Sequence, residues 1–446
     1  MIVIRHRLTP TQVLALGFAG IIVIGALLLT LPVATRSGES AGFLTALFTA
    51  TSAVSVTGLV VVDTGTYWST FGQIVIMLLI QVGGLGIMTM STLFALILGR
   101  KITFKERLVM QEAFNLTSVG GIVRFAKYIL IVSFLFESIG AAILSIRFLP
   151  QMGFKKAVYY GLFHSISAFN NAGFDLMGNF NSLTGYVSDW VVNLVIMGLI
   201  VFGGLGFYVL LDVYEQKHFA RYTLHSKVVI TMTLFLIVAG ALLIFLFEYN
   251  NPKTLKPLSF STKILASLFQ SVTPRTAGFN TLSLPDMTTA SKFLTIILMF
   301  IGASPAGTGG GIKTTTFGII LYTVLSVVKG EEQVVLFKRT IPRSTVYRAI
   351  AIAFISIFIV LSVTMVLSRT ETSDFLTELY ETTSAFGTVG LSLGLTPKLT
   401  AIGKIVIILT MYSGRVGPLT LALALAQRQK EKKSIMKYAD EKVMVG

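Results

Sequence analysis

The chain has 446 residues, of which 54% are hydrophobic and only 13% are charged, and it contains no cysteine. Because a soluble globular protein carries about 25% charged residues, this composition excludes an ordinary soluble fold and indicates a polytopic membrane protein. The lack of cysteine excludes disulfides and thiolate metal sites.

Eight apolar runs are long enough to cross a bilayer as helices of about 20 residues. The first follows Arg5, His6 and Arg7 near the N-terminus. A cleaved signal peptide is the competing interpretation, which we reject because the run is long and no A-x-A site follows it. The sixth run is interrupted, and the eight runs are 11–31, 72–98, 125–148, 190–211, 228–247, 293–328, 347–367 and 402–426.

The net charge of +16 is distributed unevenly. With eight spans and the N-terminus inside, the inner segments hold 22 Lys and Arg, the outer segments hold 11, and Arg275, Lys313 and Arg415 lie at membrane depth. The positive-inside rule therefore predicts that both termini are cytoplasmic. Anionic membrane lipid or an acidic partner surface explains the basic inner face, so we predict no nucleic-acid binding.

Half-length apolar segments recur between the spans, at 41–53, 156–168, 261–272 and 375–385. At about 1.5 Å per residue such a segment reaches only about 20 Å, which is too short to cross the membrane. We therefore expect four re-entrant helices. A glycine follows each of them within a few residues, and these glycines stand 115, 105 and 112 residues apart, namely Gly58, Gly173, Gly278 and Gly390.

Helix, half-helix, loop and helix thus repeat four times, which predicts parallel repeats about an axis along the membrane normal. We assign the repeats to 1–98, 99–213, 214–328 and 329–446, the last with a cytoplasmic C-terminal tail. The predicted fold class is an all-α polytopic membrane protein, in which four pseudo-fourfold helix–pore loop–helix repeats surround one central pore.

Four inward loops can form one ring of backbone carbonyls that replaces part of the hydration shell of a monovalent cation. Glycine permits the positive φ that such a ring needs, and the negative ends of the re-entrant helices would face it. Close helix packing explains one small-residue loop but not four. The predicted selectivity filter, with K⁺ held by backbone carbonyls only, comprises Val56, Thr57, Gly58, Asn171, Ala172, Gly173, Thr276, Ala277, Gly278, Thr388, Val389 and Gly390.

The filter loops carry no ring of Asp or Glu, which argues against a calcium-type filter. Carboxylates do occur in the outer segments, where a weak cation-collecting mouth and ordinary solvated loops are equally good interpretations. They are Asp63, Asp175, Asp189, Asp286, Glu371, Asp374, Glu378 and Glu381.

The break in the sixth span is polar and glycine-rich, and Pro305 with five glycines would end a helix there. Its position just inside the filter loops favours a gate, and the alternative is a kink that neighbouring helices satisfy. Glycine-rich motifs at 83–86, 203–206 and 414–418 are expected at similar depth. The predicted gate comprises Ala303, Ser304, Pro305, Gly307, Thr308, Gly309, Gly310, Gly311, Lys313 and Arg415.

Charges at membrane depth are costly and usually functional. Arg415 could hold the loop closed through backbone carbonyls or repel cations, and a structural ion pair is the alternative. We expect Lys313 to extend toward the cytoplasmic side. Arg275 is expected to pair with a carboxylate as scaffold, whereas Glu137 has no partner that the sequence identifies.

Motifs of catalysis and nucleotide binding fail on inspection. Ile312 separates Gly311 from Lys313, so the phosphate-loop pattern is broken, and the GGLG runs lack the third glycine of a dinucleotide fingerprint. The four histidines lack metal-ligand spacing. We therefore predict that the chain is not an enzyme.

The loops SVTG, NNAG, RTAG and GTVG, together with GASPAGTGGGIKT and SGRVGP, resemble the Trk/Ktr/HKT superfamily of potassium transporters over nearly the whole chain. Without two extra N-terminal helices, the chain is most similar to the membrane subunit of bacterial Ktr systems. The resemblance implies potassium uptake, often sodium-dependent, by a homodimer in the bacterial cell membrane. It also implies a cytoplasmic ring of nucleotide-binding regulatory subunits, with no nucleotide site on this chain.

The same resemblance implies a filter at the four glycines, a gate in loop 303–313 and an interacting role for Arg415. Gly58 matches the glycine that accompanies potassium preference. The complete TVGYG signature is absent from every loop, so we expect a shorter and less selective filter than a potassium channel has.

Two other function classes remain open on the sequence alone. One is a secondary transporter of a small organic solute that uses broken helices at the midplane. The other is a structural membrane subunit with no path of its own. Four parallel repeats favour the pore over both.

Overall fold

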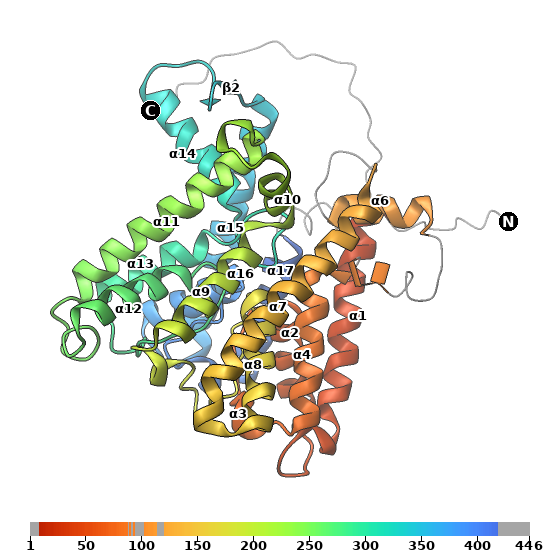
Figure 1. Cartoon of the computed structure of the whole chain (residues 1–446), viewed down its shortest axis with the longest axis vertical. Coiled ribbons are helices and arrows are strands. Elements are labelled where there is room, and N and C mark those ends of the chain that lie inside the picture. The colour runs from red at the N-terminus through yellow and green to blue at the C-terminus, as the bar shows by residue number, and fades with distance from the viewer. Residues whose placement is uncertain (1–8, 88, 91, 94–101, 114–119, 418–446) are drawn as a thin grey trace.

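The computed structural model describes residues 9–417 apart from 88, 91, 94–101 and 114–119 (Figure 1). These residues are mostly helical, which confirms the predicted fold class. The expectations for 1–8, for the inner end of the span 72–98, for 418–426 and for the C-terminal tail concern residues outside the described ranges.

Within the described ranges, four helices are individually long and apolar enough to cross a membrane, and each belongs to a different predicted repeat. Large apolar side chains such as Ile131, Leu234 and Phe354 are exposed on them, as expected for a surface that faces lipid. We call them the first helices: α1 (Pro10–Thr30), α7 (Ile122–Met152), α11 (Leu224–Glu248) and α15 (Arg343–Thr370).

The four predicted re-entrant segments are confirmed as helices of 12 to 16 residues. Each ends directly before one of the glycine-bearing loops, and the side chains near each C-terminus are buried. These half-length helices are α2 (Phe43–Val54), α8 (Phe154–Phe169), α12 (Phe260–Val272) and α16 (Phe375–Gly387).

The second helix of each repeat begins after a Ser, Thr or Asp whose side chain caps the first turn. The capping residues are Ser69, Asp189, Thr288 and Thr400. The helices are α4 (Thr70–Leu85), α9 (Trp190–Leu205), α13 (Thr289–Phe300) and α17 (Ala401–Val416).

Only the sixth span was expected to be interrupted, and that expectation was too narrow. Gly86, Gly206 and Gly417 have φ values of 82°, 92° and 94°, so α4, α9 and α17 leave the helical conformation at these glycines. The span 190–211 is therefore not continuous, since α9 and α10 (Phe207–Gln216) meet at a bend of 93°. In the sixth span, α13 and α14 (Thr314–Val328) flank residues 301–313, which we call the crossing loop.

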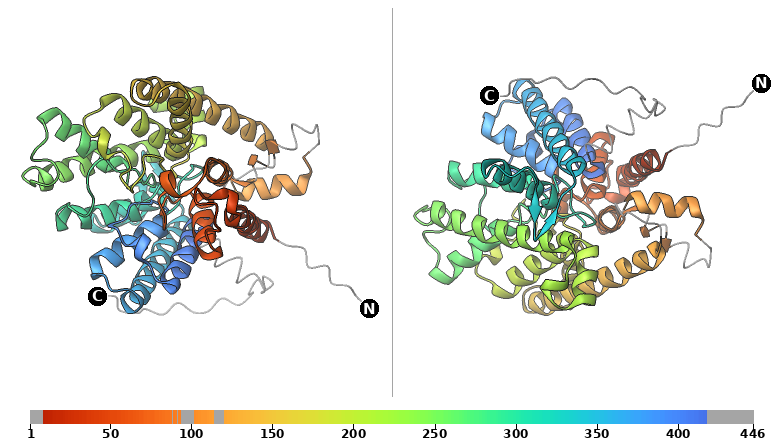
Figure 2. Two further views of the ribbon diagram at one scale, coloured as in Figure 1. Left: turned by 90° about the horizontal axis from the view of Figure 1, so that it is seen from below. Right: turned by 90° about the horizontal axis from the view of Figure 1, so that it is seen from above.

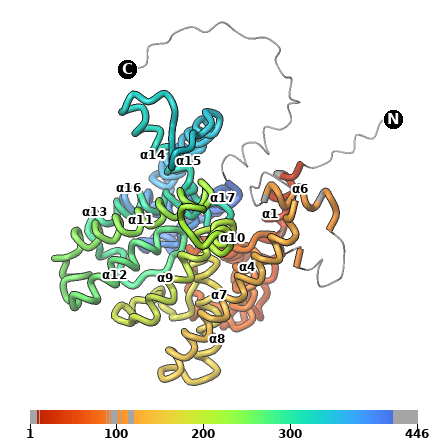
Figure 3. Tube along the Cα trace, turned by 45° about the horizontal axis from the view of Figure 1, so that its top comes forward, coloured from red at the N-terminus to blue at the C-terminus, as the bar shows by residue number. Residues whose placement is uncertain are grey.

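Short elements connect the helices. The strands pair antiparallel, with Val335 opposite Thr340, and the two turn residues Phe337 and Lys338 both have positive φ, as tight hairpins require. This hairpin projects from the body beyond α14 (Figures 1 and 3). The short elements are η1 (Pro32–Ala34), α3 (Thr64–Tyr67), α6 (Phe104–Ala113), η2 (Thr184–Tyr186), η3 (Phe219–Arg221), β1 (Val335–Leu336), β2 (Arg339–Thr340) and η4 (Thr396–Lys398).

Consecutive quarters of the chain lie around one centre in chain order, from red through green and teal to blue (Figure 2). Second helices pack closely on the half-length helices. A β-carbon at Gly83 would overlap the Val54 carbonyl, and one at Gly414 would overlap that of Phe386. The exact repeat boundaries at 98, 213 and 328 stay a prediction.

Gly203 in α9 makes the same kind of approach, to the Phe169 carbonyl at the end of α8. We expect Gly203→Ala to destabilise the protein by about 1–3 kcal/mol, because the backbone of α8 has no room to move away. Gly198→Ala in the same helix is the matched control, since its β-carbon would meet no atom within 4 Å. Thermal unfolding in detergent measures both, and equal midpoints would contradict the predicted packing.

Candidate functional site

The four repeated glycines meet in a closed ring. A β-carbon on Gly58 would overlap the carbonyl oxygen of Ala172, and Gly173, Gly278 and Gly390 approach the next loop in the same way. The approached carbonyls belong to the residue before the next glycine, and the last glycine returns to the first loop. Any side chain here would obstruct the ring, so glycine is required both for space and for its positive φ of 69° to 91°. The approached residues are Ala172, Ala277, Val389 and Thr57.

The N–H groups of the loops are bonded back toward the half-length helices. The Thr57 N–H donates to the Ser52 carbonyl at 2.8 Å, and the equivalent N–H groups of Ala172, Ala277 and Val389 make bonds of 2.7 to 3.0 Å. With their donors occupied in this way, the loops keep carbonyl oxygens for a cation. A residue with positive φ precedes each glycine by two positions, an uncommon conformation for Val56, Asn171, Thr276 and Thr388.

Two serines that were not assigned to the site support the ring. The hydroxyl of Ser52 accepts from the Gly58 N–H at 3.0 Å, and that of Ser384 accepts from the Gly390 N–H at 3.1 Å. Their recurrence six residues before the glycine is visible in the sequence, but only the structure connects it with the loop backbone.

A cavity of about 620 Å³ lies on one side of the ring, and all four glycines line it. We call it the outer cavity. Of the carboxylates considered for a cation-collecting mouth, only Asp63 and Asp175 line it. Asp63 accepts from the N–H groups of Thr66 and Phe180, so it also closes the surrounding loops.

The Asp175 carboxyl is half-buried and accepts from the Met177 N–H at 2.9 Å. Burial raises its pKa to about 7, and the nearby charge of Asp63 acts in the same direction. Asp175 therefore changes charge near neutral pH at the entrance to the ring.

The remaining outer carboxylates serve the scaffold. Glu371 accepts from the N–H of Thr400, the residue that caps α17. Asp374 caps α16, and Asp189 both caps α9 and pairs with Arg147 at 2.7 Å. Asp286 pairs with Lys253. Glu378 accepts a hydrogen bond from the Ser368 hydroxyl. Glu381 accepts hydrogen bonds from the hydroxyl groups of Ser392 and Thr396. Asp63 and Asp175 are therefore the members of this set that line the outer cavity.

The crossing loop passes directly beside the ring. The Gly310 N–H donates to the Thr388 hydroxyl at 2.9 Å, and a β-carbon at Gly309 would overlap the Thr276 hydroxyl. Toward the second repeat, the Ser304 and Thr308 N–H groups donate to the Gly204 and Gly203 carbonyls at 2.9 and 3.1 Å. These carbonyls lie in the last turn of α9, where the helix ends. Backbone N–H groups of one helix break therefore bond to backbone carbonyls freed by the break in another repeat.

Arg415 ties the crossing loop to two other repeats. Its guanidinium donates to the Thr308 carbonyl, to the Gly83 carbonyl and, at 3.2 Å, to the Gly84 carbonyl. Among the described residues it forms no ion pair. The contacts match the first interpretation, in which Arg415 holds the loop through backbone carbonyls.

The Lys313 amine donates to the Gly309 carbonyl at 2.6 Å, and its extension toward the cytoplasmic side stays a prediction. Two further expectations for charges at membrane depth require correction. Arg275 meets no described carboxylate and donates to the Thr233 hydroxyl at 3.2 Å. Glu137 does have partners, Gln81 and Asn170. The sequence hid these contacts because the partners of Arg275 and Glu137 lie 33 to 56 positions away along the chain.

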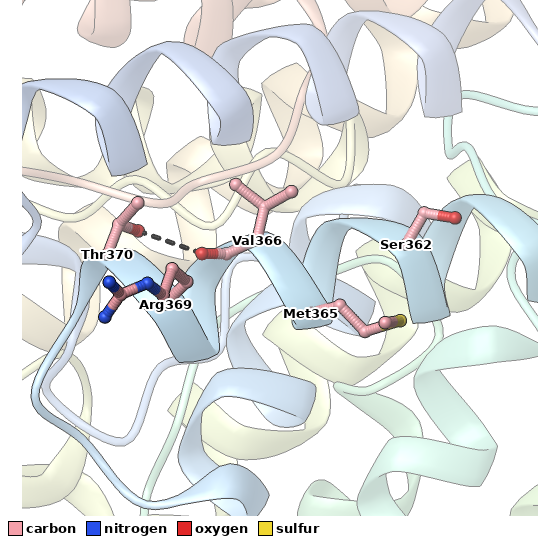
Figure 4. Close-up of a pocket in the computed structure, with 5 residues that line it drawn as sticks. All are labelled: Ser362, Met365, Val366, Arg369 and Thr370. Atoms are coloured by element: carbon pink, nitrogen blue, oxygen red, sulfur yellow. Dashed lines mark hydrogen bonds between the residues drawn. The ribbon is translucent and has the colours of Figure 1, made fainter.

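A cavity of about 440 Å³ on the other side, the inner cavity, is lined by the crossing loop at Pro305, Gly307, Gly309, Gly311 and Lys313. None of the four ring glycines lines it. The ring and the crossing loop therefore separate two cavities. A third hollow, of about 450 Å³, is a groove on α15 alone (Figure 4), where the Thr370 hydroxyl donates to the Val366 carbonyl at 3.2 Å. Because one helix supplies its whole lining, it is not part of the ring.

Comparisons with known proteins agree with this architecture. A family model described as a cation transport protein, TrkH, matches residues 9–436. The solved structure of the potassium transporter TrkH from Vibrio parahaemolyticus superposes with a TM-score of 0.73 at 18% identity, covering 94% of this chain and 86% of that one. At that identity the likeness supports the fold alone.

Curated relatives match over nearly their full length. The Ktr system potassium uptake protein B of Bacillus subtilis is 48% identical, with 99% of this chain and 97% of the relative covered. The potassium/sodium uptake protein NtpJ of Enterococcus hirae is 42% identical, with coverage of 99% and 98%. The Ktr system potassium uptake protein B of Vibrio alginolyticus is 40% identical, with coverage of 98% and 94%.

Replacing Arg415 by Gln removes the guanidinium that bridges the crossing loop to the carbonyls of α4. Charge-assisted bonds of this kind contribute about 1.5–3 kcal/mol each, so we expect amide hydrogen exchange in residues 304–310 to accelerate about tenfold or more. Arg348→Gln is the control, since Arg348 lines the same cavity and makes no described hydrogen bond to the loop. Unchanged exchange in both variants would show that Arg415 does not hold the loop.

Proposed function

The chain belongs to the TrkH family of cation transport proteins, and from that premise we propose that it is the potassium-translocating membrane subunit of a potassium uptake system. Relatives named for potassium uptake at 40% and 48% identity over almost the whole chain support the proposal. They also speak against the alternative of a transporter for a small organic solute. The family is a class of transporters, in keeping with a chain that we do not assign to an enzyme class.

The observation that carries the mechanism is the closed ring of the four glycines. A dehydrated potassium ion needs several oxygen ligands at once, and carbonyls from four loops supply them from all sides. The residues proposed to select the ion are those of the four predicted loops, Val56 to Gly58, Asn171 to Gly173, Thr276 to Gly278 and Thr388 to Gly390. Because the half-length helices end at the ring, their negative dipole ends stabilise a cation there.

We assign the gate to the crossing loop together with Arg415. The loop lies between the outer and inner cavities, and its contacts reach the second repeat at Gly203 and the fourth repeat at Thr388 and Arg415. An ion that leaves the ring inward must pass this loop. Opening therefore requires the loop to give up the bonds of Arg415 and Thr388, and Lys313 would move with it.

The assembly is inferred from the family and from the charge distribution. We place the chain in the bacterial cell membrane with both termini cytoplasmic, as the 22 Lys and Arg of the inner segments favour. We further propose a homodimer that binds a ring of nucleotide-binding regulatory subunits at the cytoplasmic face. We also propose that uptake depends on sodium as a second ion, since the Enterococcus hirae relative is named a potassium/sodium uptake protein.

Uptake of radioactive rubidium into proteoliposomes tests the function directly. The purified chain should take up rubidium in competition with potassium, and an imposed sodium gradient shows whether sodium accelerates it. A structural subunit without a path of its own would give no uptake above protein-free vesicles, and an organic-solute transporter would not respond to potassium.

Gly58→Ser tests the filter within that assay. A hydroxymethyl group at Gly58 would meet the backbone of Ala172 and Gly173, so we expect the preference for potassium over sodium to fall about tenfold or more while the protein still folds. Gly38→Ser is the control, because its φ of 75° is also positive but no atom lies within 4 Å of a β-carbon there. Equal selectivity in both variants would exclude a filter at Gly58.

Asp175 predicts a dependence on external pH. Because its pKa is raised to about 7, the carboxyl is largely neutral at pH 6 and ionised at pH 8, so the KM for rubidium should fall as the pH rises. Asp175→Asn should flatten this change. Asp286→Asn, whose carboxyl has a lowered pKa and does not line the outer cavity, should leave it intact. An unaltered pH profile in Asp175→Asn would refute the assignment.

A further inference from the structure

A carboxylate is buried beside the ring without an opposing charge. Glu137 lies within α7, and only 3% of its surface is exposed. Both carboxylate oxygens accept from the Gln81 side-chain amide at 3.0 Å, and one also accepts from the Asn170 amide at 2.9 Å. Every described contact of the carboxyl group is an N–H donor, so its two oxygens act only as acceptors. Among the described ion pairs, none includes Glu137.

The partners of Glu137 connect it to the second loop of the ring. Asn170 is the C-cap of α8, and Asn171, Ala172 and Gly173 follow it directly. The Asn170 amide also donates to the Gln81 side-chain carbonyl at 2.9 Å and to the Ile166 carbonyl at 2.9 Å. The Glu137 backbone carbonyl accepts from Ser165 on the same half-length helix at 2.7 Å. Glu137 thus fixes the end of α8 from which the second loop starts.

The other loops are held differently. The position three residues before each glycine is occupied by Ser55, Asn170, Arg275 and Gly387. Beside the third loop the buried charge is positive, since Arg275 is only 6% exposed and faces the Thr233 hydroxyl. Adjacent quarters of the ring therefore carry buried charges of opposite sign.

We propose that Glu137 is a positioning residue that sets the ion affinity of the ring, by holding the second loop through Asn170 and, when ionised, by placing beside it a negative charge that no described group compensates. The inference rests on the proposed transport function and deepens it. In the low-dielectric interior such a charge attracts a dehydrated cation more strongly than it would in water. The hydrogen bonds keep the charge at a fixed distance from the carbonyls of the second loop.

The experiment is rubidium uptake in proteoliposomes by wild type, Glu137→Gln and the double variant Gln81→Glu/Glu137→Gln. The single variant keeps the shape and removes the charge, so we expect the KM for rubidium to rise about tenfold while the maximal rate stays within about twofold. The double variant moves the carboxylate across the same hydrogen bonds and should return the KM to within about threefold of wild type.

Three outcomes would overturn the proposal. One is a KM for Glu137→Gln equal to that of wild type. Another is a loss of maximal rate and thermal stability with unchanged KM, which would make Glu137 a structural brace. The third is a double variant that fails to restore the KM. Absence of rubidium uptake by wild type would instead refute the transport function itself.

A second variant keeps the test decisive if Glu137→Gln does not accumulate in the membrane. Asn170→Ser gives the second loop the residue that the first loop carries at Ser55, and it removes the contact between the carboxylate and the loop. We expect a raised KM with an unchanged maximal rate. An unchanged KM would overturn the proposal in this variant as well.

Discussion

Backbone polar groups at membrane depth must be satisfied without water, and this constraint governs the centre of the molecule. The chain interrupts helices at two levels there, in the loops that end at the four glycines and in the breaks of the second helices. At the first level the N–H groups bond back to the half-length helices, and carbonyls remain for a cation. At the second level the breaks satisfy one another, because the crossing loop donates to carbonyls freed by the break in α9.

Arg415 supplies hydrogen-bond donors to backbone carbonyls in these breaks that accept no described backbone N–H. The last turn of α4 exposes the carbonyls of Gly83 and Gly84, and one guanidinium binds both together with Thr308. A planar group with five donors suits such a task better than an ammonium would. The charge therefore has a structural cause, and it lies where the crossing loop meets the inner cavity.

The sequence predicted the order of the helices, the half-length helices and the four glycines, because length, hydropathy and spacing are properties of consecutive residues. It did not predict the breaks at the ends of α4 and α9, since Gly86 and Gly206 sit in runs whose hydropathy continues past them. It also failed on Glu137 and Arg275, and it left the roles of the outer carboxylates open. Their partners come from distant segments or from capping geometry, and a single sequence specifies neither.

The crossing loop is also joined directly to a long helix that reaches the surface. Lys313 ends the loop, and α14 starts at the next residue and runs for 15 residues toward the projecting hairpin. A straight helix of that length is a rigid lever of about 22 Å. A partner that shifted the hairpin end by about 4 Å would turn this lever by about 10° around its inner end, at the loop. A small displacement of the hairpin would thus rotate α14 about its inner end and pull on the crossing loop between the two cavities.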